Sequence, residues 1–132
     1  MTEIITEPAR DVPVIADADV CVLGGSCTGV FAAVRAARRG ARVVLVEATN
    51  GFGGAAVNGL VNVWHSLLDT AYEREIAAGL TLETMDRLTG RGAVDRLERN
   101  PDMAFIFNSA ELKVELDALV REHDIEPMLH TR

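Results

Sequence analysis

Two short apolar runs in the first half of the chain predict buried β-strands. Val20–Leu23 is followed by a glycine, and Val43–Val46 is followed by an acid. Continuous rather than alternating apolar residues are typical of strands covered on both faces in a parallel sheet, so Cys21 is expected in the core. Between the runs, the alanine-rich stretch Val30–Arg39 predicts a helix that ends at Gly40, where a left-handed cap is common. Together these elements predict a parallel β–α–β unit.

The second half of the chain shows two further helical patterns and one more strand. Residues 71–89 carry apolar residues at helical spacing, and residues 90–103 are polar and predict a connection. The next helix begins at Asn108 or Ser109, either of which can cap it, and ends near Asp124, where glycine would be the favoured terminator. The stretch "IEPMLHT" then predicts a third strand, whose proline indicates a free or locally unpaired edge.

These elements predict an α/β fold, a Rossmann-like parallel sheet of three strands with flanking helices. Residues 1–16 contain Pro8 and Pro13, which disfavour both helices and ladders, so we expect an extended N-terminal arm. Residues 17–132 are expected to form the domain, and 132 residues suffice for one core.

Composition and charge exclude several classes of protein. The hydrophobic fraction of 48% and the charged fraction of 25% are those of an ordinary folded domain. A net charge of −7 without a basic cluster argues against nucleic-acid binding. No apolar run reaches the ~18 residues of a membrane span, and no secretory signal is visible. Cys21 and Cys27 form neither a C-x-x-C pair nor a zinc pattern, so we expect free thiols, no metal site and a cytoplasmic location.

The sequence "GGSCTG", residues 24–29, lies between the first strand and the helix and predicts a dinucleotide-binding turn. Gly24 permits the tight turn out of the strand, and Gly29 lets the helix pack closely on the sheet. The helix N-terminus then directs N–H groups at phosphates. Glu47, 23 residues after Gly24, is placed to accept hydrogen bonds from ribose hydroxyls. Ser26 replaces the usual second glycine, and its hydroxyl can donate to a phosphate oxygen. The alternative is a tight strand–helix turn without a ligand.

The residues after the second strand bear on which dinucleotide is bound. Glu47 disfavours NADP, because its carboxylate would repel the 2′-phosphate. Residues 48–63 hold four glycines and form a loop long enough to run beside a cofactor larger than NAD.

Three stretches resemble a known family: "DVCVLGGSCTGVFAAVRAARRGARVVLVE", "NGFGGAAVNGLVNVW" and "FNSAELKVELDALVREHDIEPMLHT". They are similar to the N-terminal part of FAD-dependent oxidoreductases with a glutathione-reductase-like FAD-binding fold. The resemblance implies FAD as cofactor and a role in holding its ADP moiety for hydride transfer from an organic substrate. It implies cofactor contacts at the pyrophosphate, the adenosine ribose and the glycine loop from Gly24, Gly25, Ser26, Cys27, Thr28, Gly29, Glu47, Ala48, Gly53 and Gly54. Cys27 would fill a slot beside the pyrophosphate.

The resemblance covers only the first part of such an enzyme. The second FAD-contacting segment and the substrate domain of the family have no counterpart here, so we expect an incomplete FAD-binding domain. A C-terminal flavoprotein segment or a partner subunit would complete it into an enzyme. The alternatives are a non-catalytic subunit or fragment that completes or packs on a larger flavoprotein, or an NAD-binding module. A homo-oligomer is a further expectation about its partners. No catalytic residue is assigned; His65, beyond the glycine loop, is a candidate acid–base group or substrate contact.

Overall fold

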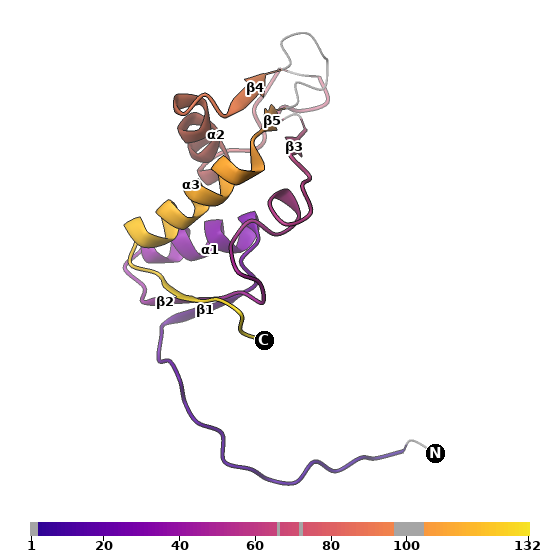
Figure 1. The fold of residues 1–132 in the computed structure, drawn as a ribbon, viewed down its shortest axis with the longest axis vertical. Coiled ribbons are helices and arrows are strands. Elements are labelled where there is room, and N and C mark those ends of the chain that lie inside the picture. Colours follow the sequence, from indigo (N-terminus) through magenta and orange to yellow (C-terminus); the bar gives the residue numbers. More distant parts are fainter. Residues whose placement is uncertain (1–2, 66, 72, 97–104) are drawn as a thin grey trace.

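The computed structural model describes residues 3–65, 67–71, 73–96 and 105–132. Its larger sheet has three parallel strands in the order β1-β2-β6, namely β1 (Val20–Leu23), β2 (Val43–Val46) and β6 (Glu126–Met128). Helices α1 (Cys27–Ala37) and α3 (Ser109–Glu122) lie together on one face of this sheet (Figure 1). The predicted α/β fold with a parallel sheet and flanking helices is confirmed.

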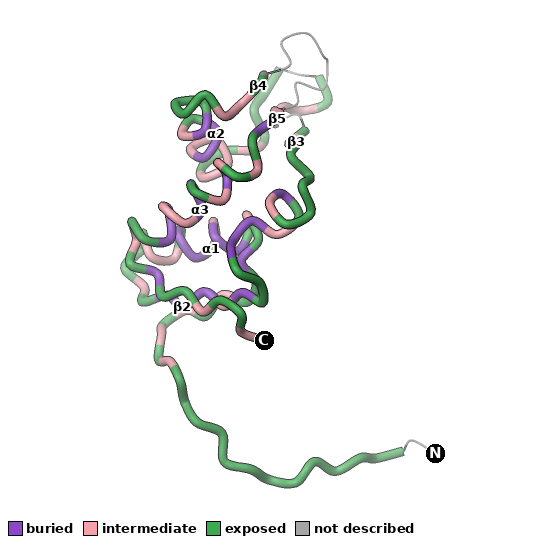
Figure 2. The backbone as a smooth tube through the Cα atoms, viewed as in Figure 1, coloured by how far each residue is buried: buried purple, intermediate pink, exposed green. Residues whose placement is uncertain are grey.

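The core lies between this sheet and the two helices. Buried residues recur along α1, β2 and α3 (Figure 2), and their apolar side chains belong to one cluster. The members of α1, β2 and α3 with an exposed fraction of 0% are Val30, Ala33, Val34, Leu45, Leu112, Leu116 and Leu119. Burying a valine or leucine side chain of this kind stabilises the fold by about 1.5–3 kcal/mol relative to exposure.

The opposite face of the sheet is largely uncovered, so the expectation that both faces are buried is wrong for β1. Leu23 is 80% exposed and Cys21 is exposed rather than part of the core. Val14 and Ile15, at the base of the arm, line a hollow on this face together with Val46. A run of apolar residues indicates that a strand can be buried on both faces, but it does not indicate which element covers each face.

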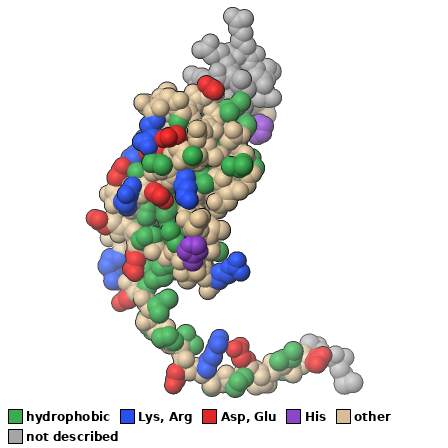
Figure 3. Space-filling model, in the orientation of Figure 1, with side chains coloured by type: hydrophobic (Ala, Val, Ile, Leu, Met, Phe, Trp, Pro, Cys, Tyr) green, Lys and Arg blue, Asp and Glu red, His purple; other side chains and the backbone are tan. Residues whose placement is uncertain are grey.

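The arm leaves the sheet and extends away from the domain (Figures 1 and 3). Residues 3–18 contain no helix or strand, and their apolar side chains Ile4, Ile5 and Val12 are exposed. The domain boundary at residue 16 stays a prediction. No helix among the described residues is long and apolar enough to cross a membrane.

A second sheet was not predicted from the sequence. It is antiparallel, in the order β3-β5-β4, and consists of β3 (Val63–Trp64), β5 (Phe105–Phe107) and β4 (Val94–Arg96). The expected connection at residues 90–103 therefore contains a strand, and residues 97–104 lie outside the described part. Strands of two or three residues are too short to show alternation.

The helix predicted at residues 71–89 is shorter than expected. Helix α2 (Leu80–Gly90) begins only after Gly79, whose φ of 71° is not helical. Upstream, Asp69 Oδ1 accepts the N–H groups of Ala71 and Glu73 and forms a turn. Aspartate competes in this way with helical hydrogen bonding, which explains why the apolar spacing of this segment misled.

The predicted helix cap at the start of α3 is confirmed. Asn108 Oδ1 accepts the N–H groups of Ala110 and Glu111. After α3, Asp124 takes a φ of 50°, the left-handed conformation in which glycine was expected. The chain then enters β6, which among the described residues pairs only with β2, so Pro127 lies at an edge of this sheet as predicted.

Candidate functional site

The turn after β1 depends on two glycines for different reasons. Gly24 has a φ of 97° and donates its N–H to the carbonyl of Val46 at 2.8 Å. Gly29 has no room for a side chain, because a Cβ there would lie 1.8 Å from the carbonyl oxygen of Gly24. The first glycine permits the turn and the second the close packing of α1, as the spacing predicts.

Position 25 requires a glycine because of the close contacts around it rather than because of its backbone angles. A Cβ at this position would lie 2.5 Å from Cδ1 of Phe52, which is 2% exposed. The N–H of Gly25 donates to Oε2 of Glu47 at 2.7 Å. Phe52 is not among the site residues predicted from the sequence, although its position inside the glycine loop "GFGG" indicates that it lies near the site.

Glu47 is engaged by the protein on both carboxylate oxygens. Oε1 accepts the N–H and the hydroxyl of Thr49 at 2.7 and 2.8 Å, while Oε2 accepts the N–H of Gly25. Burial by itself raises the pKa of Glu47, but the hydrogen bonds from Thr49, Gly25 and Ala48 together outweigh it and bring the pKa below its ordinary value. The carboxylate is therefore ionised at neutral pH. Thr49 is a second residue that sequence reasoning missed.

The glycine loop after β2 docks directly on the glycine turn. The N–H of Gly53 donates to the carbonyl of Gly25 at 2.8 Å, and Gly53 forms an isolated parallel bridge with Ser26. Gly53 and Gly54 take φ values of 113° and 51° at the start of a short 3₁₀ helix, η1 (Gly54–Ala56). Residues 24–29, 47–49 and 51–54 therefore meet at one place.

Ser26 and Cys27 begin helix α1. Ser26 Oγ accepts the N–H of Gly29 at 3.3 Å as the helix cap, and its own hydroxyl hydrogen stays available as a donor. Burial raises the pKa of Cys27 to about 11, and its Sγ lies 3.7 Å from the carbonyl oxygen of Gly53. Burial therefore outweighs the stabilisation that a helix N-terminus gives to a thiolate.

An open hollow of about 210 Å³ lies at the N-terminus of α1. Helix geometry leaves the N–H groups of Cys27 and Thr28, in the first turn, without acceptors inside the helix, while that of Gly29 donates to Ser26 Oγ. The hollow is lined by uncharged residues, namely Ser26, Cys27, Thr28, Gly53, Ala55, Ala56, Val61, Val63 and Trp64. This combination suits the diphosphate of a dinucleotide. Ala48, by contrast, is an exposed residue after Glu47, and His65 is exposed after Trp64.

A parallel β–α–β unit with a glycine turn at the helix N-terminus and an ionised acid after the second strand defines a dinucleotide-binding domain. The sequence profile of the family described as FAD dependent oxidoreductase matches residues 19–132. The chain belongs to this family, and FAD is its cofactor. No curated protein matches the chain with significant sequence similarity.

Solved structures of three proteins share the fold. THI4 of Thermovibrio ammonificans superposes with a TM-score of 0.56 at 18% identity, over 86% of this chain and 38% of that one. A geranylgeranyl bacteriochlorophyll reductase-like protein of Thermoplasma acidophilum gives a TM-score of 0.51 at 16% identity, over 86% and 30%. NikD, an amino acid oxidase of nikkomycin biosynthesis, gives 0.52 at 16%, over 86% and 43%. The chain spans less than half of each of these proteins, and such identities establish the fold alone.

Proposed function

We propose that this chain holds the ADP half of FAD in an oxidoreductase whose organic substrate gives up a hydride to the cofactor. The observation that carries this proposal is the junction of three segments by the bonds of Gly25 to Glu47 and Gly53. FAD supplies the redox chemistry when it is bound, and the chain binds and orients it.

Each part of the junction has a role in this proposal. The pyrophosphate lies at the N-terminus of α1, against residues 24–29, where the Ser26 hydroxyl donates to a phosphate oxygen. Oε2 of Glu47, which accepts the N–H of Gly25, also binds a ribose hydroxyl, with Ala48 beside it. Gly53 and Gly54 bring the backbone of the second loop close to the cofactor. The ionised Glu47 also disfavours a 2′-phosphate and therefore NADP.

The bare face of the larger sheet supports the proposal that this domain works with further flavoprotein structure. Leu23 and Cys21 are exposed on this face, whereas parallel sheets of α/β proteins are usually covered on both faces. We propose that a further segment, of the same polypeptide or of a partner subunit, covers it. Self-association of the chain through this face is the alternative. Sedimentation of the chain at increasing concentration distinguishes the two proposals, because a chain that stays monomeric at all concentrations excludes self-association.

Comparison of FAD with FMN tests the assignment to the ADP half, because FMN carries the same flavin and one phosphate but lacks the adenosine and the second phosphate. We expect the chain to bind FAD, ADP to displace it, and FMN to bind at least about tenfold more weakly, corresponding to about 1.4 kcal/mol. Flavin fluorescence and absorbance near ~450 nm follow both titrations. Equal binding of FAD and FMN, or no binding of FAD or ADP by the folded chain, contradicts the proposal. Tighter binding of NAD than FAD would favour the NAD-binding alternative.

A further inference from the structure

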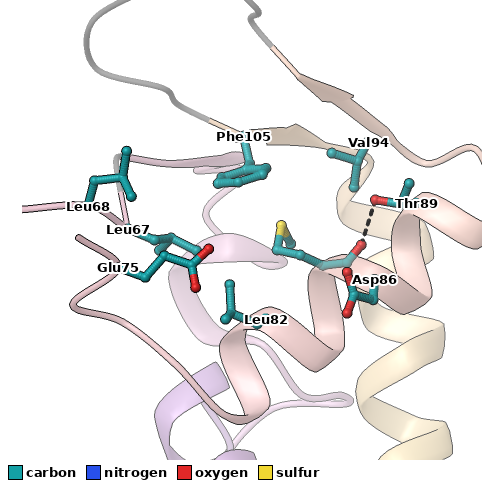
Figure 4. A pocket seen from close by; sticks show the side chains of 9 residues that line it. Leu67, Leu68, Glu75, Leu82, Asp86, Thr89, Val94 and Phe105 are labelled. Carbon is teal, nitrogen blue, oxygen red and sulfur yellow. Dashed lines mark hydrogen bonds between the residues drawn. The ribbon is translucent and has the colours of Figure 1, made fainter. Parts of the chain in front are cut away.

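A second cavity lies between α2, the stretch that carries Leu67, Leu68 and Glu75, and the β4–β5 pair (Figure 4). Its volume is about 430 Å³, within the range of pockets that hold small organic molecules. Its walls are largely apolar and include Leu67, Leu82, Met85, Val94 and Phe105. It shares no lining residue with the hollow at the N-terminus of α1.

The cavity carries two carboxylates and no basic group among its described lining residues. Glu75 reaches it from the stretch that also carries Leu67 and Leu68, and Asp86 from α2 (Figure 4). Glu83, the neighbouring acid on α2, forms ion pairs with Arg38 and Arg87. Within the described part of the chain, neither Glu75 nor Asp86 has such a pair. These two carboxylates are thus available to a ligand.

The third polar group of the cavity is already satisfied as a donor. The Thr89 hydroxyl donates to the carbonyl oxygen of Met85 at 2.7 Å, one turn earlier in α2. It offers a ligand only an acceptor, as the two carboxylates do. The polar side chains that line the cavity therefore favour a ligand that donates hydrogen bonds and carries a positive charge.

The cavity also lies close to the proposed cofactor site. Phe105 in its wall pairs across the strands β3 and β5 with Trp64, which lines the hollow at α1. Residues paired in this way project to the same face of an antiparallel sheet. The strand pair of Trp64 and Phe105 therefore joins the hollow at the N-terminus of α1 to the wall of the second cavity.

We propose that this cavity binds a small apolar molecule with a positively charged amino group. The apolar body of the ligand lies against Leu82, Met85 and Phe105. Its ammonium group pairs with the carboxylate of Glu75 or of Asp86, and both carboxylates repel an anion of the same shape. The proposal concerns the free chain and does not depend on bound FAD.

Three probes of one shape and different charge test this proposal: phenethylammonium, 2-phenylethanol and phenylacetate. Each probe is titrated into the 132-residue chain, and binding is followed by calorimetry and by the amide NMR shifts of residues 80–90. The amine should bind at least about fivefold more tightly than the alcohol. Phenylacetate should bind more weakly than the alcohol. Added salt should weaken only the amine, because screening acts on its charge.

Variants locate the effect in the cavity. The double variant Glu75→Gln, Asp86→Asn should lose the preference for the amine and bind 2-phenylethanol as before. Asp95→Asn is the matched control, because Asp95 is an exposed acid of β4 that does not line the cavity. Leu82→Trp should fill the cavity and weaken binding of both the amine and the alcohol. Equal binding of the three probes, no binding of any, or an equal effect of Asp95→Asn would overturn the proposal.

Discussion

The N–H of Gly25 donates to Oε2 of Glu47 at 2.7 Å and joins the turn after β1 to the end of β2. The acid expected to bind ribose therefore also fixes the turn that receives the phosphates. Since Thr49 uses both acceptor positions of Oε1, a ribose hydroxyl has to bind on Oε2 beside Gly25 or displace a protein donor.

Replacement of Glu47 should therefore lower stability even without cofactor. In Glu47→Gln, an oxygen can still accept from Thr49, but the amide nitrogen then faces the N–H of Gly25. We expect a loss of about 1–3 kcal/mol in the free energy of unfolding, measured with urea, because a buried donor loses its acceptor. Glu126→Gln, at an exposed position of β6, is the control and should change stability little. Equal effects of the two substitutions would show that the Gly25 bond contributes nothing.

The same carboxylate predicts how stability depends on pH. The pKa of Glu47 is lower in the folded chain than its ordinary value of 4.5, so the unfolded chain binds the proton first as pH falls. The stabilisation is complete above about pH 4.5 and is lost as pH falls through the lower folded pKa. Glu83 acts in the same direction, because its bond to Arg38 lowers its pKa. Thermal melts of the wild type should show a steeper loss below this pH than melts of Glu47→Gln. Parallel curves would contradict the assignment.

Two glycine substitutions should have opposite effects. In Gly25→Ala, the new Cβ would lie 2.5 Å from the buried Phe52 ring and 3.0 Å from Glu47 Oε2. We expect a loss of about 1–3 kcal/mol from overpacking. Gly90 ends α2 with open space around its missing side chain, so Gly90→Ala should stabilise by up to about 1 kcal/mol. Urea unfolding measures both, and tolerance of alanine at position 25 would refute the close packing of the two loops.

The two thiols should react at different rates. Cys21 is exposed on the uncovered sheet face, whereas Cys27 is partly buried with a pKa raised to about 11. At pH 8 we expect Cys21 to react with a disulfide reagent at least about tenfold faster, since the thiolate is the reacting species. Cys21→Ser should remove the fast phase and Cys27→Ser the slow one. A fast phase that disappears in Cys27→Ser would mean that the helix N-terminus activates this thiol after all.

Much of the dinucleotide unit could be predicted from the sequence because its determinants are local. Gly24, Gly29 and Gly40 stand at element ends, and Asn108 caps its own helix, so sequence spacing alone locates them. The position of Asp124 at the end of α3 is predictable for the same reason.

The elements that sequence reasoning missed depend on distant contacts. The strand of Val63 and Trp64 exists because Phe105 and Ile106 pair with it, and no local pattern records that pairing. Cys21 has the sequence environment of a core residue, yet its exposure is decided by what covers the sheet. Phe52 contacts Gly25, which lies 27 positions earlier in the chain, so its role appears only after folding.

Ser26 offers the most direct test of cofactor binding at the N-terminus of α1. Aspartate and asparagine both cap helices well, so Ser26→Asp and Ser26→Asn should leave α1 intact, and circular dichroism can verify this. Only the aspartate places a negative charge where the pyrophosphate is expected. Fluorescence titration with FAD should give a dissociation constant at least about tenfold higher for Ser26→Asp than for Ser26→Asn. Equal constants for the two folded variants would place the diphosphate elsewhere and contradict the proposed site.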